Sequence, residues 1–104
     1  MCGFIASFGQ NINDKGFKSA LENLKRRGPD SEGIWKEDDV FLGSRRLAVF
    51  DLHKRSNQPM KSICERYVLV FNGSIYNYLE LRDYLLQKGV KLKTLSDTEV
   101  LLEL

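Results

Sequence analysis

The chain begins with MCGFIASF (residues 1–8), a short apolar run that carries a reactive side chain near its start. The run ends before Gly9, which predicts a β-strand that begins at Cys2 and ends at Phe8. If an aminopeptidase removes Met1, Cys2 becomes the first residue and has both a thiol and a free α-amine. An α-amine with a pKa of ~7.7–8.0 can accept the proton of a thiol with a pKa of ~8.5. The stretch therefore predicts a nucleophile with its own base, although a cysteine at position 2 can also be chemically idle.

Length and composition indicate a single domain of ordinary globular character. The chain has 104 residues, of which 42% are hydrophobic and 29% charged, a balance typical of globular domains. Its net charge of +2 is too small to favour nucleic acid or an anionic membrane as a partner. No apolar run reaches the roughly 18 residues that a membrane span needs, and the N-terminus lacks the pattern of a secretory signal. We therefore expect neither a nucleic-acid partner nor a membrane partner.

The cysteines and the histidine add little further chemistry. Cys2 and Cys64 are the only cysteines, and they have neither the spacing of a metal site nor the number needed for a disulfide framework. We therefore predict no metal site and a reducing, cytoplasmic location. Cys64 is predicted to be a small, buried or half-buried packing residue. His53, the only histidine, falls in a polar loop and is not predicted to be catalytic.

Hydrophobic periodicity predicts a mixture of strands and helices. Phe17, Ala20, Leu21 and Leu24 follow the spacing of an amphipathic helix, with the basic residues 25–27 at its C-terminal end and a stop at Gly28-Pro29. Further helices are predicted over 77–88 and from 97 onward, and strands over 34–36, 40–42, 45–52 and 67–71, with a strand or connector at 90–95.

Two kinds of local signal refine these elements. The continuous apolar run Tyr67–Phe71 predicts a central strand buried on both faces, and Asn72-Gly73 after it is a strong signal for a hairpin turn. Capping boxes are predicted at Asn77 with Glu80 and within Ser96–Glu99. Gly89 is predicted to cap the end of the helix over 77–88, and Tyr78, Leu81 and Leu85 are predicted to form its core stripe.

Six motifs, in order along the whole chain, resemble the N-terminal glutaminase domain of class II glutamine amidotransferases of the glutamine-dependent asparagine synthetase type. The Gly-Pro-Asp motif distinguishes this type from its relatives, which carry another residue in place of the proline. The six are Met1-Cys2-Gly3, Arg27-Gly28-Pro29-Asp30, Arg45-Arg46-Leu47, Gln58-Pro59-Met60, Asn72-Gly73-Ser74-Ile75-Tyr76-Asn77 and Ser96-Asp97-Thr98-Glu99.

The resemblance implies an α+β fold of the N-terminal-nucleophile hydrolase class, an α-β-β-α sandwich, of which residues 1–104 are expected to be the N-terminal portion. It implies hydrolysis of L-glutamine to glutamate and ammonia through a thioester on Cys2. In the whole enzyme a C-terminal synthetase domain uses the ammonia, with ATP and Mg²⁺, to amidate aspartate. We expect that domain to lie outside these residues and expect no cofactor within them. The 104 residues alone are expected to be inactive, and their exposed apolar faces favour self-association, for example as a homodimer.

The resemblance also implies a role for each residue of the site. The oxyanion of the tetrahedral intermediate needs preorganised donors, and a guanidinium suits the α-carboxylate of glutamine. The implied set is Cys2 as nucleophile, Asn72 and Gly73 as oxyanion donors, Arg46 for the carboxylate, Asp97 and Ser74 for the ammonium, and the backbone of Val49 and Phe50 as pocket lining. Ser74 departs from the family, which usually has Glu there, and this predicts weaker glutamine binding. Arg27, where His is common, lies outside the proposed chemistry.

Simpler interpretations of the same residues stay open at this point. Arg46 can be a surface cation at a strand start, Asp97 can complement a helix dipole, and Asn72-Gly73 can form only a hairpin. On those interpretations the chain is a non-catalytic, truncated amidotransferase fragment that serves as a structural or interaction module. A thiol redox protein is disfavoured because the sequence has no C-x-x-C motif.

Overall fold

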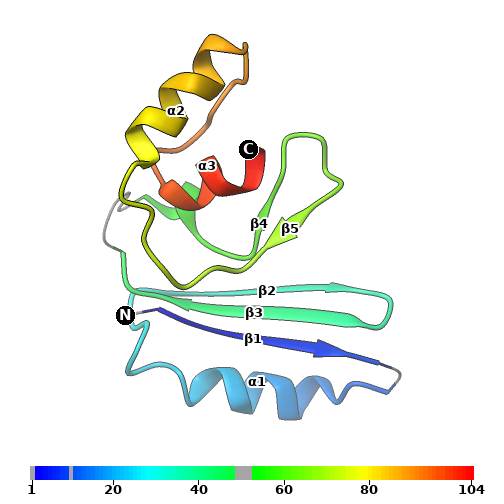
Figure 1. Cartoon of the computed structure of the whole chain (residues 1–104). Coiled ribbons are helices and arrows are strands. Elements are labelled where there is room, and N and C mark those ends of the chain that lie inside the picture. The colour runs from blue at the N-terminus through cyan, green and yellow to red at the C-terminus, as the bar shows by residue number, and fades with distance from the viewer. Residues whose placement is uncertain (1, 10, 49–52) are drawn as a thin grey trace.

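The computed structural model describes residues 2–9, 11–48 and 53–104. Within these ranges the chain forms a three-stranded sheet, a two-stranded sheet, three α-helices and a short 3₁₀ turn, η1 (Lys54–Ser56) (Figure 1). The predicted α+β class is confirmed at this level. No helix in this part of the chain is long and apolar enough to cross a membrane.

The first sheet is built from the N-terminal strand and a hairpin. Strands β1 (Gly3–Phe8), β2 (Ser31–Glu37) and β3 (Val40–Arg46) pair antiparallel in the order β1-β3-β2. The turn between β2 and β3 contains Asp38, whose φ of 47° is the left-handed conformation of a tight turn. The predicted strands at 2–8, 34–36 and 40–42 are confirmed, with the hairpin longer than predicted.

Helix α1 (Asp14–Glu22) covers one face of this sheet (Figure 1). The predicted apolar stripe is confirmed in part: Phe17 and Leu21 are buried and Ala20 is partly buried, but Leu24 lies beyond the end of the helix. The predicted stop at Gly28-Pro29 is wrong, because the helix ends at Glu22. Phe17 meets the ring of Phe41 edge-on, with 5.4 Å between ring centroids. The basic residues 25–27 lie in the turns after the helix rather than in its last turn, which contains no basic residue.

Arg45 and Arg46 leave β3 on opposite faces, as alternation along a strand requires. Arg45 Nε donates to Gly28 O at 3.1 Å and Nη1 to Glu32 Oε2 at 2.7 Å, whereas Arg46 faces the loop that follows β3. The predicted strand over 45–52 is wrong at residues 47 and 48, because the Ala48 N–H bonds to a side chain instead of a neighbouring strand. Residues 49–52 of that prediction lie outside the described residues.

The second sheet is much smaller than the sequence suggests. Strands β4 (Met60–Lys61) and β5 (Val68–Leu69) form an antiparallel pair. The predicted central strand over 67–71 is wrong: Tyr67 is 57% exposed, Val68–Phe71 are only partly buried, and β5 pairs with β4 alone among the described strands. A run of β-forming residues favours an apolar strand, but a central strand also needs a neighbouring strand at each edge and a packed layer on each face.

The turn between β4 and β5 lies before the second strand of the pair. It contains Cys64 and Glu65, and Glu65 has a φ of 60°. The hairpin predicted at Asn72-Gly73 is therefore wrong, because those residues follow the pair instead of connecting it. Cys64 is exposed at the turn, so its predicted burial is also wrong.

Helix α2 (Tyr78–Gln87) keeps its predicted position, with Asn77 at the N-cap. Asn77 makes no side-chain hydrogen bond at the N-terminus of the helix, so the predicted capping box is wrong there. Its predicted end is confirmed, because Gly89 follows with a φ of 85°, the conformation typical of a C-terminal glycine cap. The predicted core stripe is confirmed in part: Leu85 is buried, and Tyr78 and Leu81 are partly buried.

Helix α3 (Asp97–Glu103) begins with half of the predicted capping box. Ser96 Oγ accepts the Thr98 N–H at 3.0 Å. The Glu99 carboxylate instead accepts the N–H groups of Lys93 and Thr94, each at 2.7 Å, and the Thr94 hydroxyl at 2.6 Å. The connector before α3 is thus fastened to the helix by a buried carboxylate.

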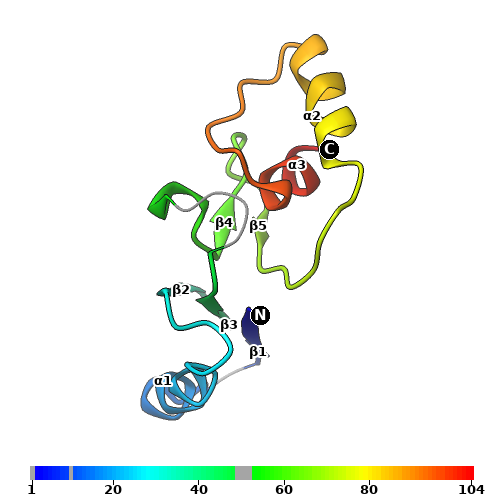
Figure 2. The same ribbon diagram turned by 90° about the vertical axis from the view of Figure 1, so that its left-hand side faces the viewer.

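The elements form successive layers in space. Figure 1 shows α1 below the three-stranded sheet, the β4–β5 pair and α3 above it, and α2 farthest away. Figure 2 shows the three-stranded sheet edge-on between α1 and the smaller pair. Among the described residues, the buried hydrophobic side chains are those of Phe17, Leu21, Leu42, Met60, Leu85 and Val100.

Candidate active site

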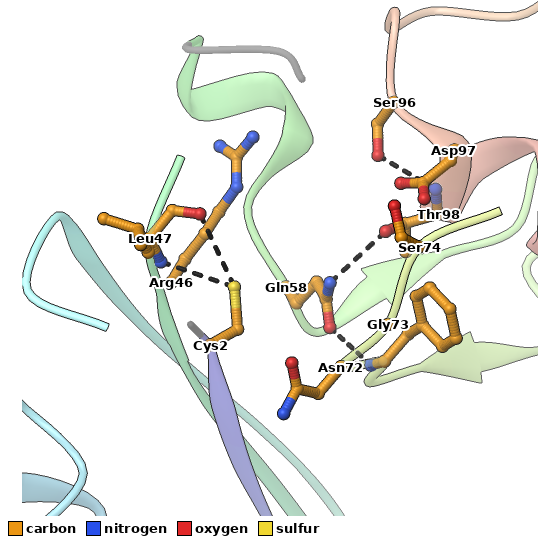
Figure 3. Close-up of a pocket in the computed structure, with 11 residues that line it drawn as sticks. Cys2, Arg46, Leu47, Gln58, Asn72, Gly73, Ser74, Ser96, Asp97 and Thr98 are labelled. Carbon is orange, nitrogen blue, oxygen red and sulfur yellow. Dashed lines mark hydrogen bonds between the residues drawn. The ribbon is translucent and has the colours of Figure 1, made fainter. Parts of the chain in front are cut away.

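A cavity of about 370 Å³ lies between the first sheet and the segments above it (Figure 3). Its size is at the lower end of small-molecule sites, which span roughly 300–1,000 Å³. Figure 3 shows Cys2 and Leu47 on one side and residues 72–74 with the start of α3 on the other. The lining residues are Cys2, Arg46, Leu47, Gln58, Phe71, Asn72, Gly73, Ser74, Ser96, Asp97 and Thr98.

The Cys2 thiol is held by the backbone that follows β3. The Leu47 N–H donates to Cys2 Sγ at 3.4 Å, and the thiol is 3.5 Å from Leu47 O, to which it can donate. Asp30 fixes the next residue, because its Oδ2 accepts the Ala48 N–H at 2.8 Å. The sulfur therefore has a donor for its anionic form and an acceptor for its neutral form, both on one anchored residue.

Arg46 lies in the same cavity, with its guanidinium directed by the loop after β3. Nη1 donates to His53 O at 3.1 Å and to Asn57 Oδ1 at 2.9 Å. Asn57 Oδ1 also accepts the Ser31 hydroxyl at 3.0 Å, which ties the loop to β2. Arg46 is only 8% exposed, so it is not the surface cation that the simpler interpretation suggested.

The segment Asn72–Ser74 forms the opposite wall without regular secondary structure. It is fastened at both ends: the Phe71 N–H donates to Gln58 Oε1 at 2.5 Å, and the Ile75 N–H donates to Asp97 Oδ2 at 3.0 Å. An exposed segment held in this way can present an amide side chain and backbone N–H groups to the cavity.

Asp97 enters the cavity from the first turn of α3. It is 4% exposed, and its bond to Ile75 occupies Oδ2. Its burial in the cavity wall distinguishes it from a solvent-exposed acidic residue that only complements a helix dipole.

Six of the residues predicted for the site line this one cavity. Val49 and Phe50, which were also predicted, lie outside the described residues. The six are Cys2, Arg46, Asn72, Gly73, Ser74 and Asp97.

Sequence reasoning assigned no role to several residues that shape the cavity. Asp30 and Gln58 are polar residues within two of the six motifs. Their place in those motifs was the signal that could have marked them as part of the site. Leu47 also lies within such a motif, but it acts through a backbone N–H, which no residue type indicates. Asn57 acts through its amide oxygen and lies outside the six motifs. These residues fix the orientation of the ones that were predicted.

The second cysteine lies away from the cavity. A hydrogen bond with Ser62, 3.3 Å from sulfur to oxygen, lowers the pKa of the exposed Cys64 thiol. Among residues 2–9, 11–48 and 53–104, no group of three or more His, Cys, Asp or Glu side chains is placed to hold a metal ion.

Comparisons with known proteins give the family. The family model described as a glutamine amidotransferase domain matches residues 1–104. Glutamine-hydrolysing asparagine synthetase 1 of Bacillus subtilis is 40% identical over 108 residues, which cover 98% of this chain and 17% of that protein. Asparagine synthetase 3 of the same organism is 40% identical over 83 residues, covering 78% of this chain and 13% of that protein. Asparagine synthetase 1 of Arabidopsis thaliana is 36% identical over 108 residues, covering 100% of this chain and 18% of that protein.

The chain thus spans less than a fifth of the length of these three curated relatives. The match nevertheless covers every residue of the chain, and it agrees with the motifs that gave the resemblance. The chain belongs to the glutamine amidotransferase domain family.

Proposed function

We propose that this chain is the N-terminal portion of a glutaminase domain, which hydrolyses L-glutamine to glutamate and ammonia through a thioester on Cys2. The observation that carries the proposal is the shared cavity. It gathers a thiol, a buried guanidinium, an amide-bearing segment and a buried carboxylate from four separate parts of the chain. The layer order of α1, first sheet, second sheet and α3 also supports the α-β-β-α sandwich of N-terminal-nucleophile hydrolases.

Glutamine has two charged ends and one reactive amide, and the cavity offers a complement for each. The Arg46 guanidinium can bind the α-carboxylate. Asp97 keeps Oδ2 on the Ile75 N–H, so Oδ1 is the oxygen that would accept from the α-ammonium, with the Ser74 hydroxyl beside it. The side-chain amide of the substrate then points toward Cys2 on the opposite wall.

The first half of the reaction forms the thioester. After removal of Met1, the α-amine of Cys2 takes the thiol proton, and the sulfur attacks the carboxamide carbon of glutamine. The carbonyl oxygen becomes an oxyanion, which the Asn72 side chain and the Gly73 N–H stabilise, a contribution of roughly 3–4 kcal/mol for each donor. The α-ammonium of Cys2 then protonates the leaving nitrogen of the substrate amide, the C–N bond breaks, and ammonia departs.

The second half regenerates the thiol. The α-amine of Cys2 takes a proton from water, and the hydroxide attacks the thioester carbon. The C–S bond then breaks to release glutamate, and the α-ammonium of Cys2 returns its proton to the thiolate. The Leu47 N–H, 3.4 Å from Sγ, is placed to donate to the thiolate in both halves. One backbone group thus supports the sulfur whenever it carries negative charge.

The use of the ammonia belongs to the full-length protein. The relatives are asparagine synthetases by name, and we propose that a C-terminal synthetase domain uses ATP and Mg²⁺ to amidate aspartate in the cytoplasm. The cavity described here is lined by groups for a small amino acid, so no ATP or Mg²⁺ step is assigned to these residues.

The proposal is tested by ammonia release from L-glutamine with the full-length protein. We expect turnover in the wild type and in Cys64→Ala, because Cys64 lies outside the cavity. Cys2→Ala is expected to lose turnover by at least about a thousandfold, since it removes the nucleophile. Equal turnover in Cys2→Ala and wild type would exclude the proposed chemistry.

A further inference from the structure

Gln58 lies at the centre of the cavity wall, yet the proposed chemistry does not use it. Its side chain is 7% exposed and extends between the Asn72–Ser74 segment and the start of α3 (Figure 3). A buried amide that lost its partners would cost free energy, so the placement of this side chain depends on what it binds on each side.

The two ends of the Gln58 amide bind two different walls of the cavity. Oε1 accepts the Phe71 N–H at 2.5 Å, directly before the residues assigned to the oxyanion. Nε2 donates to Thr98 Oγ1 at 3.4 Å, directly after the carboxylate assigned to the ammonium. An amide carries one acceptor and two donors on a single rigid plane, so one side chain can set the separation of both segments.

The backbone of Gln58 is fixed from a third direction. At Gly33 in β2, an added Cβ would lie 2.0 Å from Gln58 O, so the two backbones are in direct contact. The preceding residue, Asn57, binds both Arg46 and Ser31. The backbone of Gln58 is therefore fixed, and this limits how far its side-chain amide can move with either of the two segments that it binds.

We propose that Gln58 is a positioning residue for glutamine hydrolysis: it holds the oxyanion donors Asn72 and Gly73 at a fixed distance from Asp97. This inference rests on the proposed glutaminase function and adds to it the element that aligns the two halves of the substrate site. Gln58 touches neither the reacting atoms nor Cys2 in this role. It acts through Phe71 and Thr98.

The inference predicts a specific kinetic pattern. Gln58→Met keeps the length of the side chain and removes both hydrogen bonds, so we expect KM for glutamine to rise and kcat to fall, each by between about tenfold and a hundredfold. Thr98→Val keeps the shape of residue 98 and removes only the hydrogen bond between Gln58 Nε2 and α3. We expect it to raise KM severalfold while kcat stays within about twofold.

The experiment measures kcat and KM for glutamine in the full-length protein for wild type, both variants and Gln87→Met. Gln87 is an exposed residue at the end of α2 and is not among the residues that line the cavity, so the same substitution there is the matched control. Thermal unfolding is recorded for each protein. A partly unfolded sample lowers apparent kcat but leaves KM unchanged, so the rise in KM is the diagnostic result.

The outcomes separate this inference from the proposed function. If wild type and Gln87→Met hydrolyse glutamine and KM in Gln58→Met and Thr98→Val stays within twofold of wild type, the positioning role is wrong and the glutaminase function stands. If Gln58→Met does not fold, KM of Thr98→Val decides the question alone. If the wild type releases no ammonia, the proposed function fails and the positioning role fails with it.

Discussion

At the scale of single residues, the cavity depends on polar groups that hold other polar groups. Cys2 is supported by Leu47, whose neighbour Ala48 is in turn held by Asp30. Arg46 is directed by Asn57. Such chains of contacts fix the rotamers of reactive side chains before a substrate arrives, which lowers the cost of ordering them on binding.

Ser74 provides a direct test of how the substrate ammonium is bound. A serine hydroxyl can accept a hydrogen bond there but brings no charge. We therefore predict that Ser74→Glu lowers KM for glutamine in the full-length protein by about tenfold, because a charged acceptor strengthens the hydrogen bond. Ser19→Glu, on the exposed face of α1, should leave KM unchanged. An unchanged or higher KM in Ser74→Glu would exclude this role for residue 74.

Cys64 yields a pH-dependent prediction independent of the cavity. Its hydrogen bond with Ser62 lowers the thiol pKa, and the thiolate is the form that reacts with alkylating agents. In the Cys2→Ala background, the pH midpoint of iodoacetamide alkylation should therefore lie below that of an unperturbed cysteine. Ser62→Ala should move the midpoint upward. A midpoint that Ser62→Ala does not shift would show that the hydroxyl has no influence on the thiol.

At the scale of elements, the ends of helices and strands are where local pattern and tertiary contact disagree. The Ser-x-x-Glu pattern correctly marks the start of α3, but Glu99 binds the incoming connector rather than closing a capping box. The run at 67–71 has the composition of a central strand, and only β5 forms within it. Both differences arise because the available partners are set by chain segments that a local pattern does not include.

Glu99 is predicted to be important for stability because its carboxylate is buried and accepts three hydrogen bonds. Glu99→Gln replaces one acceptor oxygen by a donor that faces other donors. We expect the free energy of unfolding to fall by about 1–3 kcal/mol, measured by chemical denaturation. Glu80→Gln, on the exposed side of α2, should change it by less than about 0.5 kcal/mol. Equal effects of the two substitutions would contradict the role assigned to Glu99.

At the scale of the whole molecule, the cavity exists where the first sheet meets the segments around the second. Patterns in the sequence were enough to predict the α1 stripe, the β2–β3 hairpin and the position of α2, because each depends on residues close in sequence. The resemblance supplied six of the residues that line the cavity. The contact between Gly33 and Gln58 and the bonds that Gln58 makes could not be predicted, because they join distant segments through backbone shape and a single amide.

We predict that the close contact between Gly33 in β2 and the backbone of Gln58 is essential for holding the first sheet against the segment before β4. In Gly33→Ala the new Cβ would overlap Gln58 O, so we expect a loss of about 1–3 kcal/mol in the free energy of unfolding and a rise in KM for glutamine. Gly16→Ala is the matched control, since the nearest atom to its Cβ would be 3.6 Å away. A Gly33→Ala protein with the stability and KM of Gly16→Ala would show that the close approach is not required.

The central claim, that Cys2 attacks glutamine as the first residue of the processed chain, is tested most directly by trapping the intermediate. The full-length protein is quenched with acid while it consumes L-glutamine, and its N-terminal peptide is identified by mass spectrometry. We predict a peptide that begins at Cys2 and carries a γ-glutamyl group on it. A peptide that still begins with Met1, or an unmodified Cys2 with the glutamyl group on Cys64, would contradict the account.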